Sequence, residues 1–330
     1  MKQARILCLG ELLMDMVAQT DASGAVTGFS MKPGGAAGNV AVAISRLGGK
    51  AGILAKVSKD FFGERMKAVM EENGVDASGV ILDPERKIAL AFVTFDEERK
   101  PTYLFYRENA ASASLSAEEI DPAVFRGVQA LYFSSMGLVR DPLRAANYEA
   151  ARLAAQAGAR VAFDPNIRLG VWPSPEAART EILKMLALVN VCKMNDEELF
   201  FLFGEGDMQA KCREIFANCP QMELLAITLG AEGALLMNRK GCSSRVGTLC
   251  TDVVDTVGAG DSFFATLLMY AADKGFILES ASELREALTY ANAAALLTAQ
   301  RPGAIPAMPT LAEVERVREG YQRTSKAGGF

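Results

Sequence analysis

Short apolar runs that alternate with helical patterns constrain the fold of this chain most strongly. Several of these runs are predicted as buried strands, and two of the helical patterns end at Gly74 and Gly158. Such alternation indicates a mostly parallel sheet covered on both faces, with sites at the C-terminal ends of its strands. The predicted strands are Ile6–Leu9, Ala51–Val57, Ala130–Phe133, Val161–Phe163, Leu188–Cys192 and Leu224–Thr228, and the two helices are Phe61–Asn73 and Pro142–Gln156.

Composition narrows the classes of function. The chain has 330 residues, of which 50% are hydrophobic, and a net charge of −5. This length suits one large α/β domain or two small ones. The acidic balance, without a long basic run, argues against nucleic acid or an anionic membrane as a partner. No apolar stretch is long enough to span a bilayer and the N-terminal residues lack a signal-peptide pattern, so we expect a cytoplasmic protein.

The sequence contains no histidine. This excludes Ser-His-Asp and Cys-His catalysis and histidine-based zinc sites, so acid–base chemistry must come from other side chains. None of the six cysteines forms a CxxC pair, which argues against a metal knuckle and favours reduced thiols.

A turn of small residues precedes an apolar helical pattern in the C-terminal third. Asp255-Thr256-Val257-Gly258-Ala259-Gly260-Asp261 is followed directly by the pattern Ser262–Ala271. The glycines allow close approach of the backbone to a ligand, and a helix N-terminus favours a phosphate. We expect Asp261 at the first position of the helix. There it could take a proton from an attacking hydroxyl or merely cap the helix, and the segment alone does not separate these interpretations.

A second glycine-rich segment, Pro33–Asn39, precedes a predicted helix at Val40–Leu47. Asn39 could cap that helix, and the glycines could simply form a turn. The first strand lacks a GxGxxG loop, so an NAD dehydrogenase is disfavoured. A Walker A sequence is also absent, so ATP would have to bind through another scaffold.

Three strand-like runs interrupt the alternation: Val26–Lys32, Ile88–Phe95 and Thr102–Tyr106. The last two are joined by the polar connection 96–101, as in a hairpin. We expect a small β-sheet that projects from the main domain. One face, with Leu90, Phe92, Leu104 and Tyr106, could cover a ligand or pair with another subunit; an ordinary edge hairpin is the alternative.

The two glycine-rich segments together resemble the ribokinase-like (PfkB) family of sugar kinases. The resemblance extends over essentially the whole chain and includes Asp164–Arg168, Asn195–Glu198, Thr228–Gly233 and Gly303–Pro306. It implies a single three-layer α/β/α kinase domain over 1–330 with a β-lid formed by about 12–33 and 86–110. It also implies transfer of the ATP γ-phosphate to a sugar hydroxyl, with Mg²⁺ and a monovalent cation such as K⁺. We expect a homodimer formed through the lid, because the second face of the lid is too apolar to be exposed to water. A catalytically silent binding protein on the same fold is a competing interpretation.

The resemblance assigns roles to the matching residues. Asp261 would be the catalytic base, and since the ordinary pKa of Asp is near 3.9, we expect it to be ionised at neutral pH without tuning. The anion hole would comprise Gly258, Ala259 and Gly260. The sugar side would comprise Asp15, Gly34, Gly35, Asn39, Tyr106, Arg107, Asp164 and Arg168. The nucleotide side would add Lys193, Thr228, Gly230, Gly233 and Asn292 to Gly258 and Gly260.

Cation sites are also implied by the resemblance. Asn195 and Glu198 would organise Mg²⁺ through water, and Asp255 would hold the monovalent cation. From the residues alone, Asn195 could equally cap the next helix, because Glu198 falls at the capping-box position.

The identity of the sugar is left open by the motifs. Gly303–Thr310 and Asp164–Leu169 resemble fructokinases, whereas Ser112, where an aspartate is expected, resembles 2-keto-3-deoxygluconate kinases. Arg107 and Arg168 would suit an acidic sugar, because guanidinium pairs well with carboxylate. Fructokinases also carry these arginines. We favour fructose as the substrate, with 2-keto-3-deoxygluconate as the alternative. Nucleosides are the least favoured of the three.

Overall fold

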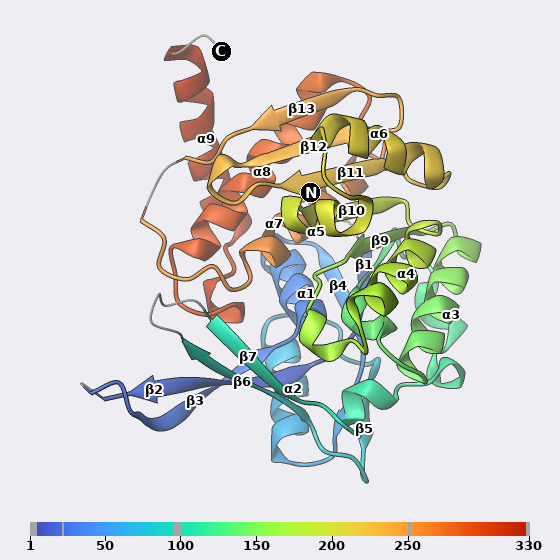
Figure 1. The fold of residues 1–330 in the computed structure, drawn as a ribbon, viewed down its shortest axis with the longest axis vertical. Coiled ribbons are helices and arrows are strands. Elements are labelled where there is room, and N and C mark those ends of the chain that lie inside the picture. Colours follow the sequence, from blue (N-terminus) through green and yellow to red (C-terminus); the bar gives the residue numbers. More distant parts are fainter. Residues whose placement is uncertain (1–4, 22, 96–100, 250–251, 328–330) are drawn as a thin grey trace.

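The computed structural model describes residues 5–21, 23–95, 101–249 and 252–327. Within these residues the main chain builds one large sheet covered by helices (Figure 1), so the predicted α/β architecture is confirmed. The strands from β11 to β5 run parallel, and β12 and β13 complete one edge in antiparallel orientation. The order across the sheet is β13 (Ser243–Val246), β12 (Ala234–Asn238), β11 (Leu224–Thr228), β10 (Val191–Asn195), β9 (Arg160–Asp164), β8 (Ala130–Ser134), β1 (Arg5–Leu9), β4 (Lys50–Ser58) and β5 (Val80–Asp83).

Alternate residues of each strand enter two separate hydrophobic cores, because side chains of a strand point to opposite faces. Ile6 and Cys8 of β1 pack on one face, whereas Leu7 and Leu9 pack on the other. The first face is covered by α1 (Ala36–Arg46), α2 (Phe61–Glu72), α7 (Ala259–Asp273), α8 (Ala281–Ala299) and α9 (Leu311–Ala327). The second is covered by α3 (Leu143–Gln156), α4 (Pro175–Leu186), α5 (Asp196–Phe203) and α6 (Met208–Asn218).

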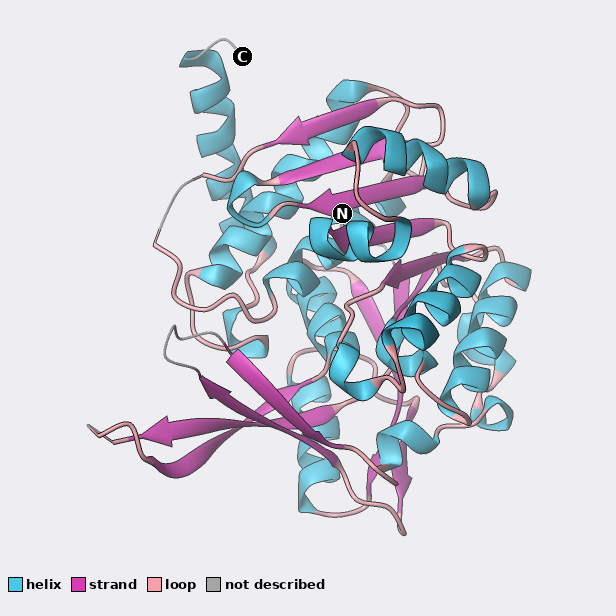
Figure 2. Cartoon of the chain, viewed as in Figure 1, coloured by secondary structure: helices cyan, strands magenta, loops and turns pink. Residues whose placement is uncertain are grey.

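A second, four-stranded sheet projects from the large one (Figure 2). Its order is β3 (Val26–Gly34), β2 (Leu13–Thr20), β6 (Ala89–Phe95) and β7 (Pro101–Tyr106). The interpretation as an edge hairpin is therefore wrong. Of the predicted connection 96–101, residues 96–100 lie outside the described residues and Pro101 begins β7. One face exposes large apolar side chains, namely Val26, Phe29, Met31, Leu104 and Tyr106.

Two helices begin earlier than the sequence predicted. Gly35, with φ of 104°, caps α1, so Asn39 lies inside the helix instead of capping it. Gly258, with φ of 81°, caps α7, and Asp261 is the third residue of the helix instead of the first. In both cases a glycine that tolerates positive φ makes the turn, and the small residues that follow already belong to the helix.

The other predicted boundaries need one correction. The strand that was expected to begin at Leu188 begins at Val191. Leu188 is 44% exposed and lies before the point where this strand enters the sheet. Five cysteines lie among the described residues, and all five are free thiols; Cys250 is not described. Across the described ranges, every helix is either too short or too polar to cross a lipid bilayer.

Candidate active site

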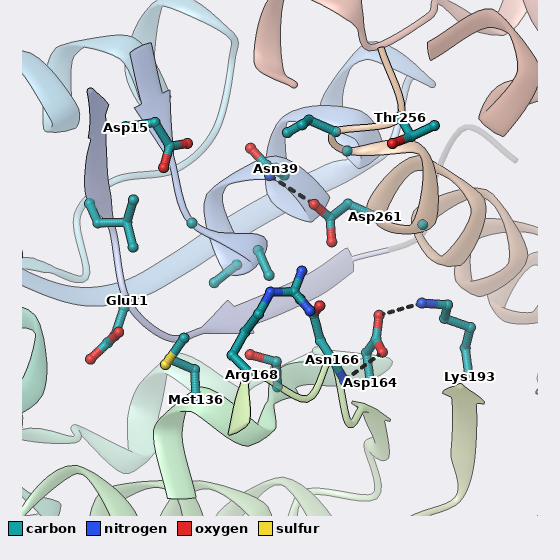
Figure 3. A pocket seen from close by; sticks show the side chains of 18 of the residues that line it. Glu11, Asp15, Asn39, Met136, Asp164, Asn166, Arg168, Lys193, Thr256 and Asp261 are labelled. Carbon is teal, nitrogen blue, oxygen red and sulfur yellow. Dashed lines mark hydrogen bonds and ion pairs between the residues drawn. The ribbon is translucent and has the colours of Figure 1, made fainter. Parts of the chain in front are cut away.

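A cavity of about 380 Å³ lies where the strands β1, β8, β9 and β10 end and the helices α1, α5 and α7 begin. This is the edge at which open parallel sheets bind ligands. Figure 3 shows side chains from both ends of the chain facing one another across it. Of the predicted site residues, the cavity is lined by Asp15, Gly35, Asn39, Asp164, Arg168, Lys193, Asn195, Glu198, Gly258, Gly260 and Asp261.

Asp261 is the buried carboxylate at the start of α7. The side-chain amide of Asn39 donates a hydrogen bond of 2.8 Å to its Oδ2, which joins α1 to α7 (Figure 3). Burial raises the pKa of Asp261 to about 6; Asp164 adds to this shift, while the Asn39 hydrogen bond and Lys193 oppose it. The expectation of an untuned aspartate is therefore wrong, yet the group is still mostly ionised at neutral pH.

Lys193 is a buried cation between carboxylates. Its ammonium lies 2.9 Å from Oδ2 of Asp164, whose Oδ1 accepts a hydrogen bond from the backbone N–H of Asn166. Burial alone would lower the pKa of Lys193, but the charges of Asp164 and Glu198 outweigh it and raise that pKa. A Cβ on Gly260 would lie 3.1 Å from Nζ of Lys193, so the first turn of α7 approaches the ammonium closely.

Asn195 and Glu198 form the capping box of α5. Oδ1 of Asn195 accepts from the N–H of Glu198, and Oε2 of Glu198 accepts from the N–H of Asn195, at 2.7 and 2.9 Å. The other carboxylate oxygen of Glu198 accepts from the N–H of Ile167 at 2.7 Å. Burial raises the pKa of Glu198, and Asp164 raises it further. The cap predicted from the residues is confirmed, and both side chains also line the cavity.

Asp15 lies on β2, on the side of the cavity formed by the small sheet. A Cβ on Gly34 would lie only 2.1 Å from Oδ2 of Asp15, so glycine is what allows this carboxylate to cross the neighbouring strand. Burial raises the pKa of Asp15 to about 7; Lys32 opposes the shift and Asp261 adds to it. Asp261 thus raises the pKa of a second carboxylate that lines the same cavity.

Three predicted sugar residues, Gly34, Tyr106 and Arg107, are not among those that line the cavity. Tyr106 is 59% exposed on the apolar face of the small sheet, where the centroid of its ring lies 5.4 Å from that of Phe92. Successive residues of a strand point to opposite faces, so Phe105 lines the cavity instead. The buried Arg107 forms an ion pair with Glu11.

Glu11 lines the cavity and was missed by the sequence analysis. It lies two residues after the end of β1, at the edge where sites in such folds lie, and this position was the available signal.

The predicted nucleotide residues Thr228, Gly230, Gly233 and Asn292 are likewise absent from the lining of this cavity. Two of them lie together next to the end of β13. The side-chain amide of Asn292 donates a hydrogen bond of 3.0 Å to the carbonyl oxygen of Val246. A Cβ on Gly233 would lie 2.0 Å from that same oxygen. Thr228 ends β11 and Gly230 begins the turn that leads to β12.

Asp255 also lies outside the cavity lining. Its two carboxylate oxygens accept hydrogen bonds from the N–H groups of Val257 and Gly303, at 3.0 and 2.8 Å. The side chain therefore fastens the loop before α7 to the loop at 301–304. Among the described residues, no three acidic or cysteine side chains gather in a way that could hold a metal ion.

Solved structures with the same fold indicate the class of the chain. It superposes with a TM-score of 0.86 and 32% identity on a fructokinase with bound ATP from Xylella fastidiosa, covering 96% of this chain and 99% of that one. A fructokinase from Vibrio cholerae O395, solved with fructose, ADP and calcium ion, gives a TM-score of 0.83 and 28% identity, covering 95% of this chain and 98% of that one. A double mutant of that fructokinase, solved with fructose, ADP and potassium ion, gives the same values. The chain is thus a phosphotransferase that acts on a sugar hydroxyl.

The family follows from the sequence comparisons. "Probable fructokinase-3" from Arabidopsis thaliana is 38% identical over 307 residues, which cover 92% of this chain and 88% of that protein. The family model described as pfkB family carbohydrate kinase matches residues 3–311. The chain belongs to the pfkB family of carbohydrate kinases, as the two glycine-rich segments predicted.

Proposed function

We propose that the chain is an ATP-dependent fructokinase, a single kinase domain that transfers the γ-phosphate of ATP to a hydroxyl of fructose. The observation that carries this proposal is the hydrogen bond between Asn39 and Asp261, which brings the two glycine-rich segments to one cavity. The similarity to fructokinases over nearly the whole chain supports fructose as the substrate.

The proposed reaction is a direct transfer. Asp261 accepts the proton of the attacking sugar hydroxyl while the new O–P bond forms and ADP leaves with the electrons of the broken bond. The backbone at Gly258, Ala259 and Gly260, at the positive end of α7, stabilises the charge on the phosphoryl oxygens. Lys193 adds a fixed cation beside Gly260.

On the sugar side, we propose that Asp15 and Asn39 bind hydroxyl groups. Oδ1 of Asn39 is buried and has no hydrogen-bond partner in the described part of the chain, so it can accept from a sugar hydroxyl. Asp164 and Arg168 would complete this side, with Gly34 and Gly35 allowing the close approach. Arg107 acts through Glu11 instead of touching the sugar directly.

On the nucleotide side, we propose that the turn at Thr228, Gly230 and Gly233 borders the nucleotide, with Asn292 holding the neighbouring strand end. Both oxygens of Glu198 already accept from backbone N–H groups, and this donor set fits a water-mediated Mg²⁺ better than a directly chelated one. When bound, Mg²⁺ supplies charge neutralisation to the phosphates. The loops joined by Asp255 would offer backbone carbonyls to K⁺.

We further propose that the small sheet is a lid that also forms a homodimer. Its outer face exposes Phe29, Met31, Leu104 and Tyr106, and a continuous apolar patch of this kind favours contact with a second copy. Light scattering should give twice the mass of the chain, and a monomeric mass at micromolar concentration would refute the dimer.

The function is tested by following ADP release with fructose, 2-keto-3-deoxygluconate, ribose and adenosine. We expect fructose to give the highest kcat/KM. 2-keto-3-deoxygluconate is the second candidate because Arg168 provides a cation at the cavity. Release of ADP with the acidic sugar alone would replace the first proposal by the second, and ATP binding without turnover of any sugar would favour a silent binding protein.

The pH dependence of kcat should report Asp261. Because the pKa of Asp261 is raised to about 6, activity at saturating sugar should rise as the pH increases through this value and the base loses its proton. Asn39→Ala removes a hydrogen bond that favours the carboxylate, so the acid limb should move to higher pH.

The control is Asn218→Ala, which alters an exposed asparagine at the end of α6. Its profile should match that of the unaltered protein. An acid limb that stays in place in Asn39→Ala would show that Asp261 is not the group that titrates.

A further inference from the structure

Arg46 is the last residue of α1, and its guanidinium joins three segments of the chain. Nε and Nη2 donate hydrogen bonds to Oδ1 of Asn73, at 3.2 and 2.9 Å, where α2 ends. Nη1 donates to the carbonyl oxygens of Pro306 and Met308, at 3.2 and 2.8 Å. A basic residue in the last turn of a helix commonly interacts with that helix's own carbonyls, but these acceptors all belong to other segments. Arg46 therefore does more than terminate α1.

The segment 303–308, which Arg46 holds, lies directly against the turn that begins α7. A Cβ on Gly258 would lie 3.0 Å from Cβ of Ala304 and 3.1 Å from Cε of Met308. Ala304 and Met308 are buried, and Gly258 is the N-cap of α7 in the left-handed conformation. The segment therefore packs against the backbone of the proposed anion hole, on the side away from solvent.

Helix α1 also holds the proposed base, because Asn39 donates a hydrogen bond to Asp261 of α7. Asn39 and Arg46 are seven positions apart, close to two helical turns. Their side chains therefore leave α1 in nearly the same direction, about 10 Å apart along its axis. Helices α1 and α7 pack together in the first hydrophobic core (Figure 1). One helix thus contacts both the side chain of the base and the segment behind the anion hole.

Phosphoryl transfer depends on the relative position of these two parts of the site. The base must reach the attacking hydroxyl while the backbone N–H groups at 258–260 face the phosphoryl oxygens. A displacement of about 1 Å in such an arrangement can lower the rate by about 10²-fold. Arg46 is not among the residues that line the cavity, so it can influence the reaction only through the segments that it joins.

We propose that Arg46 is a positioning residue for phosphoryl transfer. By holding the carbonyl groups of Pro306 and Met308, it keeps the segment 303–308 against Gly258 and so keeps the anion hole aligned with the base. This role rests on the proposed kinase function and deepens it, because the alignment of the site then depends on a residue outside the cavity.

The test is Arg46→Met, which keeps an unbranched side chain and removes every donor. We expect kcat to fall at least about tenfold. KM for fructose should stay within about twofold, because no contact with the bound sugar is altered. The acid limb of the kcat profile should also stay in place, since Asn39 still donates to Asp261.

Two further variants accompany this one. Arg46→Lys should give an intermediate kcat, because its ammonium can donate to the carbonyl groups but lacks the planar fork that also reaches Asn73. Arg65→Met, at an exposed position on α2, is the matched control and should leave kcat unchanged.

Hydrogen exchange gives a readout that does not depend on activity. Peptides covering 254–262 and 303–308 should exchange faster in Arg46→Met than in the unaltered protein, whereas β8 and β9 should keep their rates. A merely structural role would instead raise exchange throughout the chain. That outcome, or an unchanged kcat in folded Arg46→Met, would overturn the proposal. If Arg46→Met does not fold, Arg46→Lys decides by the same two measurements.

Failure of the proposed function is distinguishable from failure of the role of Arg46. If the unaltered protein phosphorylates no sugar, the kinase proposal fails, and exchange at 254–262 still decides on Arg46. Equal exchange there in the unaltered protein and in Arg46→Met would refute the positioning role whatever the reaction is.

Discussion

Asp261→Asn should lower kcat by about 10²- to 10⁴-fold while ATP binding is retained. The amide keeps the size of the carboxylate and its place at the start of α7, but it cannot accept the proton of the attacking hydroxyl. Because Asn39 donates to Asp261, the amide oxygen can keep that hydrogen bond, and the two helices should stay joined. Steady-state kinetics with fructose and calorimetric titration with ATP measure the two effects separately.

The matched control is Asp252→Asn, an exposed aspartate on the loop before α7. Its kcat should equal that of the unaltered protein. Activity of Asp261→Asn near the starting value would remove Asp261 from the role of base. A parallel loss of ATP binding would assign the residue to the nucleotide instead.

Lys193→Met should have the second largest effect. It leaves Asp164 buried without its cation, and breaking such a pair costs about 3–5 kcal/mol of stability. It also removes the positive charge beside Gly260, so kcat should fall by about 10²- to 10³-fold. Thermal unfolding and kinetics at a temperature where the variant is folded measure the two losses.

The double variant Asp164→Asn/Lys193→Met separates these losses. With both charges gone, much of the stability should return, because no uncompensated charge remains in the core. Asp164 raises the pKa of Asp261, so its removal also helps to keep the proposed base ionised. The single variant Asp164→Asn keeps the lysine and measures the loss that belongs to Asp164 itself. If kcat of the double variant stays below that of Asp164→Asn, the lysine acts on the transferred group; equal kcat values would mean that Lys193 is only structural.

The sequence was sufficient to predict the parts of the site that depend on local pattern. The alternation of runs predicted the parallel sheet, and the two glycine-rich segments predicted turns ahead of α1 and α7, although both helices begin earlier than expected. These predictions succeeded because a strand period, a cap or a positive φ is decided by neighbours in the chain. The capping box at Asn195 and Glu198 could be predicted for the same reason, because its two residues are three positions apart in the chain.

Partners that lie far apart in the chain could not be predicted in this way. Arg107 was expected to face the sugar, yet its pairing with Glu11 is decided by the position of the small sheet against β1. The raised pKa of Asp261 likewise depends on burial beneath segments from the other end of the chain. The boundary of α1 was missed for a different reason, because Gly38 was interpreted as part of the turn although Ala36 and Ala37 favour a helix.

The hydrogen bond between Asn39 and Asp261 joins residues 222 positions apart, and this has a consequence for protein synthesis. A ribosome completes β1, β2, β3 and α1 early, while most of the chain is still untranslated. Asp261 arrives only with α7. A nascent or prematurely terminated chain therefore carries Asn39 but lacks the proposed base, Asp261. It cannot consume ATP in a futile reaction before its last third has emerged.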